Sequence, residues 1–395
     1  MNGQDAGTVS RATAAEPSVW VVSSYRAGEN SQLDGLARRL GLSYVKFIPR
    51  YRWFAPLLGL LRLVSPLGIV NYRELPGKDA PDLIICSGMK NEPFCRWLRR
   101  RSGGRSRIVF LGRTWAPADR FDLLVGTPQY RMRPSHKVII NNLTLHGVFP
   151  ESLQDARERF AGRFRNLPRP LTAVLVGGDS GPHYFGPRTA ARLARALTRL
   201  HATSAGTLFV STSSRTGNKA VDTLQRLLPE GTTLYRWRRG DADNPYFGML
   251  AHADRVVVTS DSVAMMSEAA ATGSPVLVFN VDEPTDDEVD VRAGFYRLMM
   301  RYLPQRVTRD LALFHERFIA SGYGRWLGEA VGETTVTPPA DEFSHTVARV
   351  RDLLNLPVGP VDGAPPEAPQ DRPSTIRQLP VRESLPATKP RSSTG

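Results

Sequence analysis

Short apolar runs alternate with helical patterns along most of the chain, and they form two successive series. The first series predicts strands at 19–22, 43–47, 83–85, 108–110, 123–125 and 138–140. A glycine-containing loop and a helix near 32–40 follow the first of these runs. Such alternation is typical of a largely parallel sheet that is covered by helices.

The second series begins after a linker-like segment, 166–170, which contains two prolines. It predicts strands at 172–176, 207–211, 233–237, 255–259 and 275–279. Helices are expected at 190–200, 218–228, 246–251, 263–271, 309–321 and 342–354. Two α/β series of similar length predict two Rossmann-like lobes that face each other across a cleft, residues 18–166 and residues 167–357.

The two ends of the chain differ in composition from this central region. Residues 1–17 are small and polar, and residues 358–395 are rich in Pro, Ser, Thr and Arg. Segments with so few apolar side chains do not bury enough surface to offset the entropy lost on folding. We therefore expect a disordered N-terminal leader and a disordered C-terminal tail.

The formal net charge of +14 favours anionic partners such as nucleotide phosphates or acidic lipids. No nucleic-acid recognition module is apparent, so specific binding to nucleic acid is not expected. Two cysteines are too few for a disulfide framework, and no metal-ligand spacing is found, so no metal and no cofactor are expected. The start of the chain lacks the pattern of a secretion signal, which favours a cytoplasmic location. The oligomeric state is not indicated.

The most apolar stretch, 53–70, is interrupted by Pro56, Arg62 and Pro66. A membrane-spanning helix needs about 20 mostly apolar residues, so this stretch is not expected to cross a bilayer. It follows a basic and aromatic segment, 46–54. Two interpretations remain open: peripheral contact with the anionic inner face of a membrane, or a core helix whose flanking arginines are solvated.

Three strand-to-helix turns of the second series carry residue types that suit a phosphate group. Glycine lets the backbone approach a ligand, serine and arginine bind phosphate oxygens, and a helix start attracts negative charge. Because parallel strands end at one edge of a sheet, we expect the turns to form one donor site, although each alone is also explained as a plain turn or helix cap. The candidate donor-binding residues are Gly177, Gly178, Ser213, Arg215, Asp261, Ser262 and Glu268.

A similar turn follows the first strand of the first series, at residues 23–32. Its candidate acceptor-side residues are Gly28, Asn30 and Gln32, and Glu29 is a candidate catalytic base. The alternative is that this turn only caps its helix. His146 and His183 are candidate bases by residue type, because imidazole titrates near neutral pH, but lone histidines are more often structural.

Taken together, these residues resemble bacterial members of the mitochondrial fission ELM (elongated mitochondria) family, which is named after a plant factor. The resemblance covers roughly residues 19–330. It is carried by the segments 28–32, 82–88, 121–130, 177–178, 211–216, 244–246 and 258–262, with Glu268 and Gly273. The family is similar to GT-B glycosyltransferases and sugar-nucleotide epimerases, which implies a nucleotide sugar in the second lobe. In lipid-sugar transferases of that fold, a glutamate matching Glu268 binds ribose, and loops matching 177–181 and Ser262 face the diphosphate.

The resemblance and the three turns lead us to expect a GT-B-type glycosyltransferase that uses no metal. It would transfer a sugar from a nucleotide sugar to an envelope glycolipid or glycan, with Glu29 or His146 as the base. Two alternatives stay open. The first is a non-catalytic adaptor that recruits a membrane-remodelling partner, and the second is a sugar-nucleotide epimerase.

Overall fold

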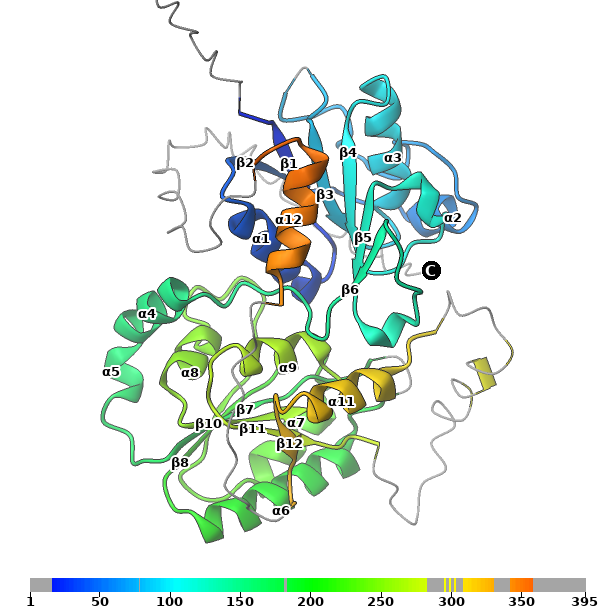
Figure 1. The fold of residues 1–395 in the computed structure, drawn as a ribbon. Helices are drawn as coiled ribbons and strands as arrows, with labels where there is room; N and C mark the ends of the chain where they lie inside the picture. Colours follow the sequence, from blue (N-terminus) through cyan, green and yellow to red (C-terminus); the bar gives the residue numbers. More distant parts are fainter. Residues whose placement is uncertain are drawn as a thin grey trace, which may run out of the picture.

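The computed structural model describes residues 16–77, 79–180, 183–282, 308–329 and 342–357, together with Phe295, Leu298, Met299 and Tyr302. Each of the two lobes is built on a six-stranded parallel sheet that is flanked by helices (Figure 1). The expected α/β class and the two Rossmann-like lobes are confirmed. The predicted C-terminal tail and all but the last two residues of the predicted leader lie outside the described residues.

The first sheet has the strand order β2-β1-β3-β4-β5-β6. Its strands are β1 (Val19–Val22), β2 (Tyr44–Phe47), β3 (Leu83–Ser87), β4 (Arg107–Leu111), β5 (Leu123–Gly126) and β6 (Val138–Ile140). The lobe also contains α1 (Ala27–Leu40), α2 (Ala55–Leu60), α3 (Glu92–Arg101), η1 (Ala118–Arg120) and η2 (Pro128–Tyr130). Alternate residues of β1 pack on opposite sides, Val21 in the cluster with Leu36 of α1 and Val22 in the cluster with Phe94 of α3. The apolar runs therefore form strands that are buried on both faces.

The second sheet has the order β12-β11-β10-β7-β8-β9. Its strands are β7 (Leu171–Leu175), β8 (Thr207–Ser211), β9 (Thr233–Tyr235), β10 (Arg255–Thr259), β11 (Val276–Phe279) and β12 (Arg325–Trp326). The helices of this half are α6 (Pro187–Thr203), α7 (Asn218–Leu227), α8 (Tyr246–His252), α9 (Val263–Ala270) and α11 (Leu311–Ala320). Leu193 and Leu197 of α6 pack with Val174 and Val210 on one face, and Met266 and Phe314 pack with Val258 on the other.

Both sheets contain a point at which the chain reverses its direction of travel across the strands. In the first sheet β1 lies between β2 and β3, and in the second sheet β7 lies between β8 and β10. Loops at the carboxyl ends of strands separate at such a reversal, which is where ligands of open α/β sheets bind. The turns after β1, β3, β7 and β10 are therefore the ones in which a site is expected.

Several segments connect the two lobes. Helices α4 (Pro150–Arg159) and α5 (Ala161–Phe164), which the sequence analysis did not predict, lead from one sheet to the next. Near the end of the described chain, α12 (Ser344–Leu353) crosses back and lies beside α1 of the first lobe (Figure 1). Arg351 there donates a hydrogen bond of 2.8 Å to the carbonyl of Leu40. The division into domains at residues 166 and 167 stays a prediction.

Helix α1 lies so close to the chain after β6 that one of its positions accepts only glycine. A Cβ atom on Gly35 would lie 2.2 Å from the carbonyl oxygen of His146. We expect Gly35→Ala to lower the free energy of unfolding by about 1–3 kcal/mol, since the backbone of α1 must shift to relieve the overlap. Urea unfolding followed by circular dichroism measures this value.

The matched control is Gly162→Ala in α5, where an added Cβ atom meets nothing within 4 Å. That change should leave stability unchanged or raise it by up to about 1 kcal/mol, because alanine favours a helix over glycine. Equal destabilisation by both substitutions would contradict the close approach of α1 to His146.

Candidate functional site

Three turns of the second lobe meet at the carboxyl ends of β7, β8 and β10. The backbone N–H of Gly178, after β7, donates a 2.8 Å hydrogen bond to Oδ2 of Asp261, after β10. Nη1 of Arg215, after β8, lies 3.1 Å from the same carboxylate oxygen. The structure therefore brings together residues from all three predicted turns.

The two glycines of the first turn are required by this close contact between the turns. A Cβ atom on Gly177 would lie 2.1 Å from Oδ2 of Asp261. At Gly178 φ is +153°, and a Cβ atom there would lie 2.2 Å from the backbone of Arg215. The glycines therefore allow the approach of other parts of the same chain, whereas the sequence analysis assigned them to the approach of a ligand.

The hydroxyl groups of the second turn are also used inside the protein. Ser213 Oγ and Thr216 Oγ1 both donate hydrogen bonds to the carbonyl oxygen of Gly177. Arg215 Nη1 donates a further bond of 3.1 Å to the carbonyl of Asp179. These contacts fix the second turn against the first, so a ligand role for Ser213 stays a prediction.

Asp261 is the anion at the centre of this cluster. Its side chain is buried, and burial raises the pKa of the carboxyl group, while the nearby Arg215 guanidinium acts in the opposite direction. Within the described residues, its Oδ1 atom is buried without a hydrogen-bond partner. The carboxylate offsets the charge of Arg215, and it orients Arg215 and the Gly178 N–H group.

Glu268 joins the second lobe to the first. It lies in α9 and is buried, and its carboxylate accepts a 2.5 Å bond from Tyr246 Oη and a 2.7 Å bond from Ser31 Oγ of α1. Burial raises the pKa of its carboxyl group, and the two hydroxyl donors act against this rise. Glu268 is thus placed at the cleft between the lobes, with a hydroxyl group of the first lobe as its partner.

The N-termini of α1 and α9 approach each other across the interface between the lobes. A Cβ atom on Gly28, in the first turn of α1, would lie 3.4 Å from the Cβ atom of Ala264, in the first turn of α9. Ser262 precedes α9 and makes no side-chain capping bond. The positive ends of two helix dipoles therefore face one region, which favours a negatively charged ligand there.

The first-lobe turn contains one carboxylate and an amide that closes the loop. Glu29 accepts a hydrogen bond from Ser24 Oγ and lies 3.3 Å from Arg26 Nη1. Asn30 binds both the N–H and the carbonyl of Ser24, at 2.7 and 3.0 Å. Gln32 lines a cavity of only about 10 Å³, too small for a sugar. Among Glu29, Asn30 and Gln32, only Glu29 has a side chain that can accept a proton. The acceptor-side roles of Asn30 and Gln32 stay predictions.

Both candidate histidines are buried. The ring of His146 lies 5.3 Å from that of Phe343 in an edge-on contact, and burial lowers its pKa to about 3. An imidazole with this pKa is a weak base at neutral pH. His183 is held through Nδ1 by Asp282. His183 is 4% exposed, and its backbone exchanges hydrogen bonds with that of Ser180 in the segment after β7.

Two positively charged residues near the cleft, Arg309 and Lys90, were not among the predicted site residues. Arg309 Nη2 donates a 3.1 Å bond to Ser180 Oγ, and its charge acts on the phenol of Tyr25 in the other lobe. Lys90 Nζ lies 4.6 Å from the centroid of the Tyr25 ring. The sequence does indicate Lys90, because it lies shortly after the predicted strand that becomes β3. Arg309 lies 30 residues after β11, so its position next to a strand end could not be predicted in this way.

Comparison with known proteins decides the family. The model of a family described as mitochondrial fission ELM1 matches residues 27–354, which is most of the chain. The chain belongs to the mitochondrial fission ELM1 family. The mitochondrial fission protein ELM1 of Arabidopsis thaliana is 29% identical over 239 residues, which cover 54% of this chain and 55% of that protein. The chain thus spans little more than half the length of this relative.

The chain is also similar, at low scores, to solved structures. One is S. aureus MnaA in a structure with UDP, at 12% identity and a TM-score of 0.43, covering 86% of this chain and 97% of that chain. Another is the E. coli ADP-heptose lipopolysaccharide heptosyltransferase II, at 14% identity and a TM-score of 0.41, covering 77% and 99%. Scores of this size do not bear on the activity of the ELM1-family chain.

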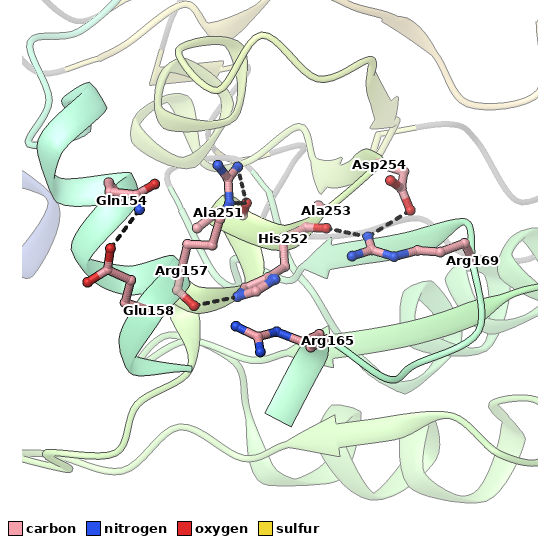
Figure 2. A pocket seen from close by; sticks show the side chains of 9 residues that line it. All are labelled: Gln154, Arg157, Glu158, Arg165, Arg169, Ala251, His252, Ala253 and Asp254. Carbon is pink, nitrogen blue, oxygen red and sulfur yellow. Dashed lines mark hydrogen bonds and ion pairs between the residues drawn. The ribbon is translucent and has the colours of Figure 1, made fainter. Parts of the chain in front are cut away.

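The ELM1-family chain also has a larger cavity, of about 610 Å³, between α4 and the C-terminal end of α8 (Figure 2). Two of its three lining arginines are bound to neighbouring groups of the chain. Arg157 donates two hydrogen bonds to the carbonyl of Ala251, and Arg169 binds the carbonyl of His252 and the carboxylate of Asp254. None of the predicted site residues lines this cavity, so it is not the candidate site.

The described residues were also compared with what a metal site and a membrane-spanning helix require. They contain no group of three or more His, Cys, Asp or Glu side chains arranged to hold a metal ion. Within the same part of the chain, no helix combines the length and the apolarity that crossing a bilayer requires.

The buried carboxyl group of Glu268 makes stability depend on pH. The pKa of this carboxyl group is higher in the folded than in the unfolded chain. Its contribution to the free energy of unfolding is therefore fully present below about pH 4.5 and is lost as the pH rises through the folded-state pKa. Each unit of pKa displacement corresponds to about 1.4 kcal/mol. We expect Glu268→Gln to remove this loss, so that the variant gains stability relative to the parent as the pH rises from 4 to 8.

Urea unfolding at a series of pH values measures this difference in free energy. Glu158→Gln, which changes an exposed carboxylate of α4, is the matched control and should track the parent at every pH. A Glu268→Gln difference that stays constant across the series would show that Glu268 does not carry a buried charge.

Proposed function

We propose that this ELM1-family chain is a GT-B-type glycosyltransferase that moves a sugar from a nucleotide sugar to an envelope glycolipid or glycan. The observation that carries the proposal is the meeting of the α1 and α9 N-termini at the reversals of strand order in both sheets. Loops at such reversals bind nucleotides in other open α/β sheets. Facing helix N-termini supply N–H groups and positive potential for a diphosphate.

Positive side chains around the cleft support the same proposal. Arg309 and Lys90 approach Tyr25 from opposite lobes, and Arg215 adds a partly exposed guanidinium. As the bond between the sugar and the diphosphate breaks, the leaving group takes the electron pair and gains negative charge. Donors that are already oriented stabilise this charge without further reorganisation, which is how a chain of this kind can act without a metal.

The base on the acceptor side is assigned to Glu29 in this proposal. The acceptor hydroxyl attacks the anomeric carbon, the bond to the diphosphate breaks, and the hydroxyl proton passes to the Glu29 carboxylate. Glu29 lies in the turn after β1, next to the α1 N-terminus, and Ser24 and Arg26 hold it in place. His146 is set aside because its low pKa makes it a poor proton acceptor.

Glu268 is proposed to bind the ribose of the donor. Ribose hydroxyl groups would take the place of the Ser31 hydroxyl on Oε1, while Tyr246 holds Oε2. Donor binding then competes with one contact between the lobes. A ribose contact for Glu268 was already expected from the sequence. The structure adds that ribose would compete with the Ser31 hydroxyl for this carboxylate.

Isothermal titration with UDP-, GDP-, CMP- and ADP-sugars tests donor binding. We expect at least one to bind, and we expect Glu268→Gln to weaken it by about tenfold or more, since hydrogen bonds to a charged group contribute about 1.5–3 kcal/mol. Ser31→Ala should strengthen binding, because it removes the competing hydroxyl. Arg226→Ala, at an exposed site on α7, is the control and should have no effect.

The opposite signs expected for Ser31 and Glu268 separate a ribose contact from general damage to the fold. If none of the four donor classes binds, the glycosyltransferase proposal fails. Weakening by both substitutions would reject the ribose role of Glu268.

Turnover of the donor that binds tests the base. With that radiolabelled nucleotide sugar and a bacterial envelope lipid extract as acceptor, we expect Glu29→Gln to lower kcat by about 10²–10⁴-fold, the usual contribution of a general base. The dissociation constant of the donor should not change. His146→Gln is expected to leave kcat within a few-fold of the parent, and a larger loss there than at Glu29 would reverse the assignment.

A non-catalytic adaptor is the second candidate function. It is favoured by the internal pairing of the site, in which Arg215 binds Asp261 and Glu268 binds Ser31 and Tyr246. An adaptor predicts that no nucleotide sugar binds and that substitutions in the cleft leave its function intact. An epimerase, in contrast, would convert a free nucleotide sugar without any acceptor.

A further inference from the structure

Segment 45–73 of the first lobe, here called the apolar–basic surface, exposes an unusual number of large apolar side chains. Trp53 is 90% exposed, Ile48 is 67% exposed and Leu61 is 56% exposed. Six more of its apolar residues are between 45% and 53% exposed: Val45, Leu57, Leu60, Leu63, Leu67 and Val70. Soluble proteins rarely leave so many large apolar side chains of one segment in water, and exposed apolar patches mark interaction sites.

The fold itself holds these side chains outward. Helix α2 packs through its small residues, since a Cβ atom on Gly59 would lie 2.8 Å from the carbonyl oxygen of Met89, and Ala55 is buried. On either side of the helix, Arg52 N donates a 2.9 Å bond to Gly68 O. The small side of α2 thus faces the lobe, and Leu57 and Leu60 face away from it.

All charged residues of the apolar–basic surface have the same sign. The segment contains Lys46, Arg50, Arg52, Arg62 and Arg73, and no Asp or Glu. Arginine and lysine extend their charged ends past apolar neighbours, so basic and apolar groups contact a layered partner together. A partner that fits is apolar below and negatively charged at its boundary with water, as an anionic bilayer is.

We propose that the apolar–basic surface inserts into the headgroup region of an anionic lipid bilayer, with Trp53 and the α2 leucines entering the acyl boundary. Within each surface Lys46 is paired with Asp34 and Arg50 with Glu74, and Arg52, Arg62 and Arg73 add to the positive charge. A second copy of the chain fits less well, because it would bring these like charges together. The six-residue α2 lies in the plane of the membrane and does not cross it.

The apolar–basic surface adjoins the loops at the acceptor side of the cleft. Tyr51 Oη donates to Asn91 Oδ1 at 2.8 Å and lies 3.1 Å from Ser23 O. Lys90 Nζ lies beside both the Tyr25 and Tyr51 rings, at 4.6 and 5.3 Å from their centroids. A bilayer on this surface would bring lipid headgroups beside the turn that holds Glu29. This last consequence rests on the proposed function, whereas membrane binding does not.

Vesicle flotation of the full chain tests the proposal. We expect binding to phosphatidylcholine vesicles with 30% phosphatidylglycerol, at least tenfold weaker binding to phosphatidylcholine alone, and weaker binding as NaCl increases. The triple variant Trp53→Ser, Leu60→Ser, Leu61→Ser should lose binding. The double variant Trp237→Ser, Leu227→Ser, which removes exposed apolar groups of the second lobe, is the matched control and should bind as the parent does.

Two further variants test the charge. Arg52→Glu should weaken binding to the anionic vesicles, and Arg226→Glu, the same change at an exposed site of α7, should weaken it less. Brominated lipids should quench tryptophan fluorescence in the parent and in Trp237→Phe, but far less in Trp53→Phe. This quenching reports insertion at Trp53 whether or not any sugar is transferred.

The proposal is overturned if the parent does not float with anionic vesicles, or if the triple variant floats as well as the parent. It is also overturned if sedimentation shows that the parent, but not the triple variant, self-associates and that vesicles do not reverse this association. Loss of donor binding with intact flotation would instead reject the glycosyltransferase proposal alone.

Discussion

The buried carboxylate of Glu268 is the constraint on which the cleft depends. It lies on α9 of one lobe and accepts its 2.7 Å bond from Ser31 on α1 of the other, so the two helices that follow the strand reversals are joined through it. An ionised carboxylate in a dry interface is stable only when hydroxyl donors satisfy it, and Tyr246 supplies the second one. The group that holds the lobes together is therefore also the group best placed to exchange a protein hydroxyl for a ligand hydroxyl.

The Asp261 carboxylate also joins separate parts of the chain, in this case three turns of the second lobe. Its carboxylate occupies the space that a side chain on Gly177 would need, and it collects the Gly178 N–H and the Arg215 guanidinium. A diphosphate placed directly on this carboxylate would meet a negative charge. The anionic ligand is better accommodated at the α9 N-terminus and toward Arg309, with Asp261 behind it as the residue that keeps the turns in position.

The sequence predicted the sheets well because their strands are buried on both faces and appear as continuous apolar runs, as in β3 and β10. It also predicted which turns would meet, since strand ends share one edge. It did not predict what the turns do with their side chains, because the partners are far away in the chain: Ser31 and Glu268 are 237 positions apart. The double glycine was a correct signal of close approach, but the approaching group is Asp261 of the same chain.

The contacts between the lobes determine whether a donor can enter. Hydrogen bonds between the two halves of the chain include Ser31 to Glu268, Thr144 N to Ser267 Oγ at 3.0 Å, and Asp310 N to Gln129 O at 2.8 Å. Arg113 and Arg131 of the first half also donate to Thr308, at 2.8 and 2.9 Å. The Ser31 bond goes to a carboxylate, and a hydrogen bond of this kind contributes about 1.5–3 kcal/mol. A ligand with a micromolar dissociation constant gains about 8 kcal/mol on binding. Displacement of the Ser31 hydroxyl from Glu268 therefore lies within what a nucleotide sugar can drive, provided that its own contacts replace the one made by Ser31.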